Sequence, residues 1–288
     1  MKLLKKLLLG TANFGMDYGI SFGKRVPKDE VFRMLDLAKE KGILGIDTAP
    51  AYGEAEEVIG EYLQKRGKSF SVITKLPKRS YKDTLEVKNT FLKSLENLKV
   101  DSVDYLLIHS FETYIEYKEK ILQAFEFLRE EKLIRAYGLS VYHPQEVMEF
   151  LKDVKGDFAV EFPLNVFDRR FMPYLREWKA LNITLFARSV FLQGLFFLPE
   201  DKLNGRFERV KDKILRLRLL AEESKLSLAC LCLGFVASFE EIDGLVVGMD
   251  SHKQLEEITS RLEAFEKPKF NLEDLEVRDE DIILPYRW

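Results

Sequence analysis

Short apolar runs alternate with longer amphipathic stretches along the whole chain. The apolar runs are rich in β-branched and aromatic residues, as buried strands are, and they span 6–12, 43–47, 70–75, 103–109, 134–140, 158–163, 183–189 and 242–248. The stretches between them repeat apolar residues at helical spacing, over 27–41, 54–66, 83–99, 115–131, 144–153, 169–180, 207–237 and 250–264. Eight strands in strict alternation with eight helices predict a (β/α)8 barrel, the TIM barrel of the α/β class.

The pattern continues without a break in composition or a linker rich in Gly, Ser or Pro. We therefore expect one domain over residues 1–288. A doubly wound sheet would also alternate strands and helices, but it needs a Gly-rich turn after an early strand. The segment LGTANFGMDYG (9–19) does not contain the G-x-G-x-x-G pattern of such a turn. The barrel is therefore the better prediction.

Four polar residues lie where apolar runs end. Asp47, Lys75 and His109 each close a predicted strand, and Tyr52 follows Asp47 by five residues. Taken singly, Asp47 could cap a helix, Tyr52 could pack, and His109 could be a hydrogen-bonded core histidine. Taken together, they are predicted to meet at the carboxyl ends of the barrel strands, where this fold carries its active sites.

The chemistry of this set points to proton transfer. A buried lysine is costly unless it is paired, and Asp47 is the natural partner for Lys75. A tyrosine beside that lysine should have its phenol pKa lowered from its ordinary value near ~10. We therefore expect Tyr52 to be a proton donor tuned for carbonyl reduction.

Charge and composition exclude several other classes of function. The net charge of −3 does not favour nucleic acid or an anionic membrane, and no apolar run approaches the ~18 residues of a membrane span. The apolar part of residues 1–10 is too short for a signal peptide. Cys230 and Cys232 would point to opposite sides of a helix, so neither a metal site nor a disulfide is expected. Buried thiols predict a reducing, cytoplasmic location, and nothing in the sequence indicates an oligomeric state.

Motifs along almost the whole chain resemble the aldo-keto reductase family. The matching segments are LGTANFG (9–15), IDTAPAYGEAEEVIG (46–60), ITK (73–75), LLIH (106–109), YGLS (137–140) and EFPLNVFDRR (161–170). The resemblance extends to a bacterial subgroup often associated with sugar and surface-polysaccharide pathways. It implies a (β/α)8 barrel whose N-terminal hairpin is shortened to a few residues.

The resemblance implies a role for each residue of the polar set. Tyr52 would donate a proton to the carbonyl oxygen of a small-molecule substrate. Lys75, paired with Asp47, would lower the pKa of that phenol, and His109 would orient the carbonyl. The cofactor would be NADP(H), with NAD(H) as the alternative.

The resemblance also implies cofactor contacts around the barrel mouth. Ser140 matches the residue that binds the carboxamide, Arg188 faces the nicotinamide, and the loop after strand seven holds the pyrophosphate. The full set of implied cofactor-binding residues is Gly10, Thr11, Ser140, Glu161, Arg188, Ser189, Phe191, Gly194, Gly248, Gln254 and Glu257.

Several positions depart from the family pattern on the cofactor side. Val141 replaces an Asn, Glu161 a Gln, and Ile258 an adenine-binding Asn. Asp250 stands where a cation often binds the 2′-phosphate of NADPH, and a carboxylate there is repulsive. We expect a reduced preference for NADPH unless a cation at 252 or 253 compensates.

Three functions remain open from the sequence. The first is an NAD(P)H-dependent aldehyde or ketone reductase, whose substrate could be sugar-like because polar residues occupy the loops: Asn13, Asp17, Asn165 and Arg170. The second is a reductase-like barrel that serves as a binding or regulatory protein. The third is a non-redox sugar epimerase or lyase that uses Tyr52 and Lys75 as acid and base.

Overall fold

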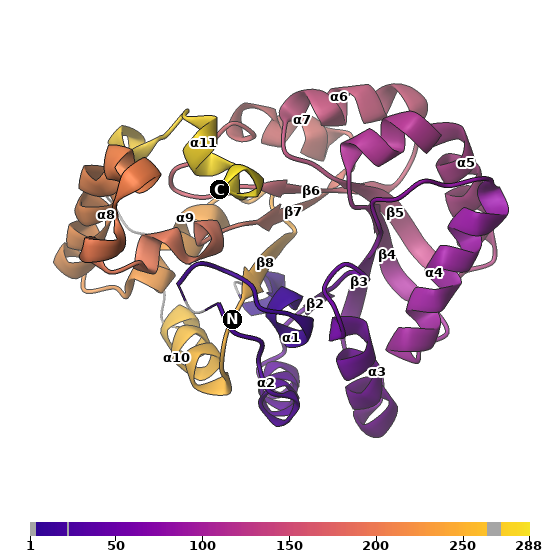
Figure 1. The fold of residues 1–288 in the computed structure, drawn as a ribbon, viewed down its shortest axis with the longest axis horizontal. Coiled ribbons are helices and arrows are strands. Elements are labelled where there is room, and N and C mark those ends of the chain that lie inside the picture. The colour runs from indigo at the N-terminus through magenta and orange to yellow at the C-terminus, as the bar shows by residue number, and fades with distance from the viewer. Residues whose placement is uncertain (1–3, 22, 264–271) are drawn as a thin grey trace.

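The computed structural model of the protein describes residues 4–21, 23–263 and 272–288, in which eight parallel strands close into a barrel (Figure 1). Each strand pairs with the next along the chain, and the last pairs with the first. The strands are β1 (Leu7–Gly10), β2 (Gly45–Asp47), β3 (Ser71–Leu76), β4 (Val103–Ile108), β5 (Ile134–Ser140), β6 (Phe158–Pro163), β7 (Thr184–Arg188) and β8 (Gly244–Gly248). The predicted (β/α)8 barrel is confirmed.

The long helices cover the outside of the barrel, whereas the short α1 lies at its mouth, directly after the carboxyl end of β1 (Figure 1). In chain order the helices are α1 (Ala12–Gly15), α2 (Lys28–Glu40), α3 (Ala55–Arg66), α4 (Thr84–Leu98), α5 (Phe111–Glu130), α6 (Pro144–Asp153), α7 (Leu175–Ala180), α8 (Lys211–Glu223), α9 (Leu228–Ala237), α10 (His252–Glu263) and α11 (Glu280–Ile283). Short 3-10 segments fill several connections, at Leu4–Lys6, Met172–Tyr174, Leu192–Phe197, Glu200–Lys202, Gly205–Val210, Glu273–Leu275 and Pro285–Arg287. The 3-10 turn before β1 places the buried Leu4 in the main core.

Three of the predicted helices need correction. The stretch 169–180 is α-helical only from Leu175, after a 3-10 turn at Met172–Tyr174. The stretch 207–237 is a 3-10 turn followed by two helices, because the chain turns between α8 and α9. Lys225 takes a left-handed φ of 56° there, and the Ser227 side chain caps α9 by accepting from the Cys230 N–H. Helix α5 begins four residues earlier than predicted because the Ser110 side chain caps it at that point. Residue 264, the expected end of α10, lies outside the described residues.

The barrel interior is packed shut below the strand ends. A cluster of inward-facing apolar side chains from around the ring fills it, namely Leu8, Ile73, Tyr105, Leu107, Ala136, Ala159 and Phe186. The Tyr105 and Phe186 rings meet edge to face with centroids 5.0 Å apart. Because hydrocarbon fills the interior, polar side chains gather at the carboxyl ends of the strands.

The two cysteines are buried free thiols on α9, as predicted. Burial raises the pKa of the Cys232 thiol, which keeps this group protonated and unreactive. Among the described residues, no group of His, Cys, Asp and Glu side chains is arranged to hold a metal ion. In the same part of the chain, no helix is long and apolar enough to cross a bilayer.

Candidate active site

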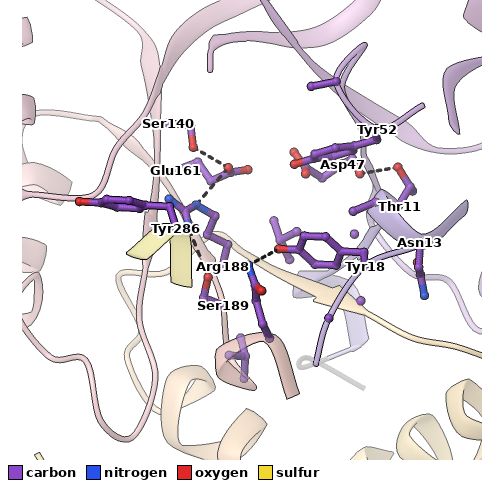
Figure 2. A pocket seen from close by; sticks show the side chains of 18 of the residues that line it. Thr11, Asn13, Tyr18, Asp47, Tyr52, Ser140, Glu161, Arg188, Ser189 and Tyr286 are labelled. Atoms are coloured by element: carbon purple, nitrogen blue, oxygen red, sulfur yellow. Dashed lines mark hydrogen bonds and ion pairs between the residues drawn. The ribbon is translucent and has the colours of Figure 1, made fainter. Parts of the chain in front are cut away.

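A cavity of about 690 Å³ opens at the carboxyl ends of the strands. Its walls come from β1, β2, β5, β6, β7 and β8, from the loops that follow the strands, including those after β3 and β4, and from the 3-10 turn Pro285–Arg287. Figure 2 shows Asp47 and Tyr52 on one side of the cavity and Ser140, Glu161 and Arg188 on the other. Residues of six strands, β3 and β4 excepted, therefore meet at one opening, and the loops after β3 and β4 also reach it.

Asp47 and Lys75 form the predicted buried pair. They end neighbouring strands, and the Lys75 Nζ donates to Asp47 Oδ1 at 2.6 Å. The two side chains are 3% and 0% exposed, so Lys75 lies behind the cavity wall. Burial would lower the pKa of Lys75, but the charges of Asp47 and Glu161 raise it above its ordinary value. Lys75 is therefore an ammonium ion at neutral pH.

Tyr52 lies above this pair, on the loop between β2 and α3. The Lys75 Nζ is 5.5 Å from the centroid of its ring. Burial raises the pKa of the Tyr52 phenol above its ordinary value, and the charge of Lys75 only partly offsets this. The prediction that the pKa of Tyr52 is lowered was wrong. The sequence shows the nearby Lys75, but it does not show how far burial removes water from the phenol. The phenol therefore keeps its proton and can donate it.

His109 faces Tyr52 from the end of β4. The two rings meet edge to face with centroids 5.8 Å apart. Burial and the positive charge of Lys75 lower the pKa of His109 to about 3. The imidazole is therefore neutral near pH 7, with one ring nitrogen able to donate a hydrogen bond and the other able to accept one.

Glu161 adds a second carboxylate to the cavity floor. Ser140 Oγ donates to its Oε1 at 2.8 Å, Lys75 Nζ lies 3.4 Å from its Oε2, and Arg188 Nε lies 3.5 Å from its Oε1. Burial opposes ionisation, but the charges of Lys75 and Arg188 lower the pKa of Glu161 to about 2. Burial and the charge of Glu161 raise the pKa of Asp47, against the pull of Lys75. The floor thus contains two carboxylates and two cations.

The loop after β7 has a strained backbone. Ser189, Leu192 and Gln193 take left-handed φ values of 59°, 47° and 51°, and Gly194 has a φ of 92°. A Cβ on Gly194 would lie 2.2 Å from Ser21 Oγ, so only glycine fits beneath the first loop. Such conformations cluster at ligand sites, and this loop lines the cavity.

Asp250, after β8, is held by neutral partners. Its Oδ1 accepts from Asn13 Nδ2 at 2.9 Å, and its backbone N–H donates to Gln254 Oε1 at 2.8 Å. Burial raises the pKa of this carboxyl. His252 does not compensate for its charge, because its backbone N–H and its Nδ1 both contact Glu30 Oε1 at 2.7 Å. Lys253 is exposed and does not line the cavity.

The structure brings most of the expected residues to the cavity. Those that line it are Gly10, Thr11, Asp47, Tyr52, His109, Ser140, Glu161, Arg188, Ser189, Phe191, Gly194, Gly248 and Gln254. Glu257 does not line it; its side chain is exposed and pairs with Arg261 at 3.1 Å.

Of the four polar loop residues expected to suit a sugar-like substrate, only Asn13 lines the cavity. Asn165 organises its own loop by accepting from the Phe167 and Asp168 N–H groups. Arg170 pairs with Asp168 at 2.8 Å, and Asp17 accepts from the Arg25 N–H. These three residues stabilise loops around the cavity.

Several residues of the site were not predicted from the sequence. Tyr18, Tyr142 and Tyr286 line the cavity, with the last two rings 4.6 Å apart. Gly15 supports Tyr52, since a Cβ on Gly15 would lie 1.9 Å from the Tyr52 carbonyl oxygen. The ANFG motif could have indicated Gly15, whereas nothing in the sequence brings residue 286 back to the mouth.

The sequence model of the Aldo/keto reductase family matches residues 6–278. The chain therefore belongs to this family, and it is an NAD(P)-dependent oxidoreductase. Membership implies NAD(P)H-dependent reduction of a small carbonyl compound.

Individual relatives agree with this assignment. The chain is 29% identical over 222 residues to "Uncharacterized oxidoreductase YqkF" of Bacillus subtilis, covering 72% of this chain and 71% of the relative. In fold it is similar to the holo form of aldo-keto reductase AKR11C1 from Bacillus halodurans, with a TM-score of 0.73, 23% identity, and coverage of 90% and 87%. It is also similar to the glycerol dehydrogenase AKR11B4 from Gluconobacter oxydans, with a TM-score of 0.72, 21% identity, and coverage of 98% and 93%.

The cavity offers polar atoms that fit a nicotinamide cofactor. Glu161 Oε2 and Asn13 Oδ1 are buried without a hydrogen-bond partner, and both residues line the cavity. Such acceptors are costly unless a ligand donates to them. The carboxamide and the adenine of the cofactor carry N–H donors, and the glycine-containing loop after β7 lines the same cavity. The residues present therefore fit the group.

Proposed function

We propose that this chain reduces small aldehydes or ketones with Tyr52 as the proton donor. The observation that carries the proposal is the buried Asp47–Lys75 pair directly behind Tyr52, with the neutral His109 at its side. Of Tyr52 and Lys75, which both carry a proton to donate, the Tyr52 phenol lines the cavity, whereas the Lys75 ammonium lies behind its wall. A carbonyl oxygen next to Tyr52 and His109 would find two hydrogen-bond donors.

When bound, the nicotinamide cofactor supplies the hydride. Tyr52 donates its proton to the carbonyl oxygen as negative charge develops there. Lys75, already an ammonium, stabilises the phenolate that remains, and Asp47 fixes the position of Lys75. His109 donates a hydrogen bond that orients the carbonyl.

We propose a polyhydroxylated, sugar-like carbonyl compound as the substrate. Support comes from the aromatic side chains Tyr18, Tyr142 and Tyr286 that line the cavity beside polar groups such as His143 and Glu146. Ring faces pack against the C–H groups of a sugar, while polar groups receive its hydroxyls. A panel of aldoses against alkyl aldehydes of equal length tests this, and equal kcat/KM values would contradict it.

We propose that the usual preference for NADPH over NADH is reduced. Among the described residues that line the cavity, the lysines and arginines are Lys78 and Arg188, and neither follows β8. At that end Asp250 presents a carboxylate instead. A phosphate dianion would find no charge-assisted partner from these side chains.

The test of the proposed function is a cofactor-dependent assay. Purified protein is mixed with NADPH or NADH and a small aldehyde, and the loss of reduced-nicotinamide absorbance is followed. Tyr52→Phe, which removes only the hydroxyl, serves as the matched control. Cofactor binding without oxidation across the aldehyde panel would favour a binding protein, and conversion of a sugar without cofactor would favour an epimerase or lyase.

We also propose that residues 1–288 form one domain and that the protein works in the cytoplasm. The closed barrel draws on strands from residue 7 to residue 248. The two thiols are buried and free, as in a reducing compartment. Limited proteolysis that releases a stable fragment would contradict the single domain.

A further inference from the structure

Glu161 places a carboxylate in the floor of the cavity. It lies on β6, in register with Ser140 of β5 and Phe186 of β7. The residue is 1% exposed, yet it lines the cavity. Oε1 accepts from Ser140 Oγ, whereas Oε2 has no hydrogen-bond partner. The Lys75 Nζ, 3.4 Å from Oε2, pairs with the charge of this carboxylate without making a hydrogen bond, so Oε2 can still accept a hydrogen bond from a ligand.

We propose that Glu161 makes the site discriminate between the two redox forms of the nicotinamide cofactor. Its negative charge binds the oxidised ring, which is cationic, in preference to the reduced ring, which is neutral. This inference rests on the proposed function, because it requires a nicotinamide in this cavity.

The geometry of the floor brings such a ring close to Glu161. A hydride moves only between atoms that are about 3–3.5 Å apart. The carbonyl that accepts it lies beside Tyr52, whose ring centroid is 5.5 Å from Lys75 Nζ. The same Nζ is 3.4 Å from Glu161 Oε2. Tyr52 and Glu161 thus lie on either side of one ammonium group and line the same cavity, so a ring in contact with that carbonyl lies in the part of the cavity that the carboxylate faces.

The formal charges of the cavity floor indicate which redox form of the cofactor Glu161 favours. Asp47 and Glu161 face Lys75 and Arg188, so two negative and two positive side chains balance. With a neutral residue at 161 the same cluster would carry one additional positive charge. That charge would repel the oxidised ring and leave the reduced ring almost unaffected.

Discrimination of this kind has a direct consequence for the reaction. Tighter binding of the oxidised form shifts the equilibrium between the oxidised and reduced cofactor on the protein by the ratio of the two dissociation constants. Glu161 therefore favours carbonyl reduction on the enzyme, because the oxidised cofactor is formed in that direction. It also slows release of the oxidised cofactor.

The experiment measures dissociation constants for the oxidised and reduced forms of one cofactor at pH 7, by calorimetry and fluorescence titration. Glu161→Gln keeps the shape and the Ser140 contact but removes the charge. The ratio of the oxidised to the reduced dissociation constant should rise by about tenfold or more, as a unit charge about 10 Å away requires at an effective dielectric constant of ~20. Asp250→Asn is the matched control: it removes a carboxylate at the other end of the cavity, and the ratio should not change.

Two further variants keep the inference falsifiable if Glu161→Gln does not fold. Glu161→Asp retains the charge and should keep the wild-type ratio even where both affinities fall. Arg188→Met removes a positive charge and should change the ratio in the opposite direction.

An unchanged ratio in both Glu161→Gln and Arg188→Met overturns the inference. Binding of neither redox form by the wild type overturns the proposed function and this inference with it. Binding of both forms with an unchanged ratio overturns this inference alone.

Discussion

The two ends of the cavity are stabilised in different ways. At the end formed by β2, β3 and β6, charged side chains neutralise one another in full burial, as the contact of Lys75 with Asp47 and Glu161 shows. At the end formed by β1 and β8, Asp250 is held by the neutral amides of Asn13 and Gln254. The first arrangement costs desolvation energy and fixes the positions of the reacting groups. The second arrangement costs less desolvation energy, and it leaves a single carboxylate that influences which nucleotide binds.

The difference predicts where substitutions act. Changes to Tyr52 and Lys75 at the charged end should reduce turnover far more than affinity for the reduced cofactor. Changes at the amide-bonded end should alter the choice of cofactor and leave the chemical step intact.

The largest effect is expected for Tyr52→Phe. Loss of the proton donor should reduce kcat by a factor of about 10²–10⁴, the usual contribution of general acid catalysis. Affinity for NAD(P)H should change little, because only a hydroxyl is lost. Single-turnover kinetics and fluorescence titration measure the two quantities. Reduction at the wild-type rate would contradict the role of Tyr52.

Lys75→Met should decrease both turnover and stability. The Lys75 charge lowers the Tyr52 pKa against burial, so its removal raises that pKa further and moves the alkaline limb of the pH–rate profile upward. Asp47 and Glu161 then lose their shared cation, which for a broken buried pair costs about 3–5 kcal/mol of unfolding free energy. Denaturant titration and pH–rate profiles are the measurements.

Lys78→Met is the matched control for the lysine variant. Lys78 follows β3 by two residues and lines the cavity, but its side chain is 68% exposed and lies 3.7 Å from Glu112. Its removal should change the unfolding free energy by less than about 1 kcal/mol. Equal losses in the two variants would show that burial of Lys75 does not matter.

Gly15→Ala should displace Tyr52 without touching a charged group. The new Cβ would collide with the Tyr52 carbonyl oxygen, so the loop must move. We expect kcat to fall roughly ten- to a hundredfold. Gly42→Ala is the control, since Gly42 has a φ of 68° and no atom within 4 Å of the added Cβ. That variant should lose about 1 kcal/mol of stability and keep its kcat.

Asp250→Arg tests the opposite end of the cavity. A charge-assisted contact to the 2′-phosphate contributes about 1.5–3 kcal/mol, so selectivity for NADPH over NADH should rise about ten- to a hundredfold. Lys253→Ala should have no comparable effect, because Lys253 is exposed and outside the cavity wall. A strong NADPH preference in the wild type that Asp250→Arg leaves unchanged would show that the phosphate binds elsewhere.

The last prediction concerns His109 and the dependence of stability on pH. Its pKa is lowered to about 3 by burial, whereas in the unfolded chain it is near its ordinary 6.5. Below pH 6.5 the unfolded state takes up a proton that the folded state does not, so this residue makes stability fall as the pH decreases from 6.5 towards 3. Thermal unfolding of the wild type and His109→Asn over that range measures the difference. A steeper loss in the variant would contradict the low pKa.

The sequence predicted the barrel and the charged end well because both depend on local patterns. Strand ends are marked by the change from apolar to polar residues, which located Asp47, Lys75 and His109 correctly. The turn between α8 and α9 was missed because it is made by a left-handed Lys225, without a Gly or Pro. The sign of the Tyr52 pKa shift was missed because desolvation depends on residues distant in sequence. Tyr286 shows the same limit, since tertiary packing alone brings it to the mouth.

The end of the described chain has a practical consequence for protein engineering. Tyr286 lines the cavity, and the Trp288 ring packs 5.0 Å from Phe207 while its Nε1 donates to the Ile282 carbonyl. Residues fused after Trp288 would therefore begin beside the opening through which substrate enters. A purification tag or fluorescent partner attached there would disturb access, whereas one attached ahead of β1 would start at the opposite, closed end of the barrel. Kinetic comparisons between variants should accordingly use N-terminal fusions.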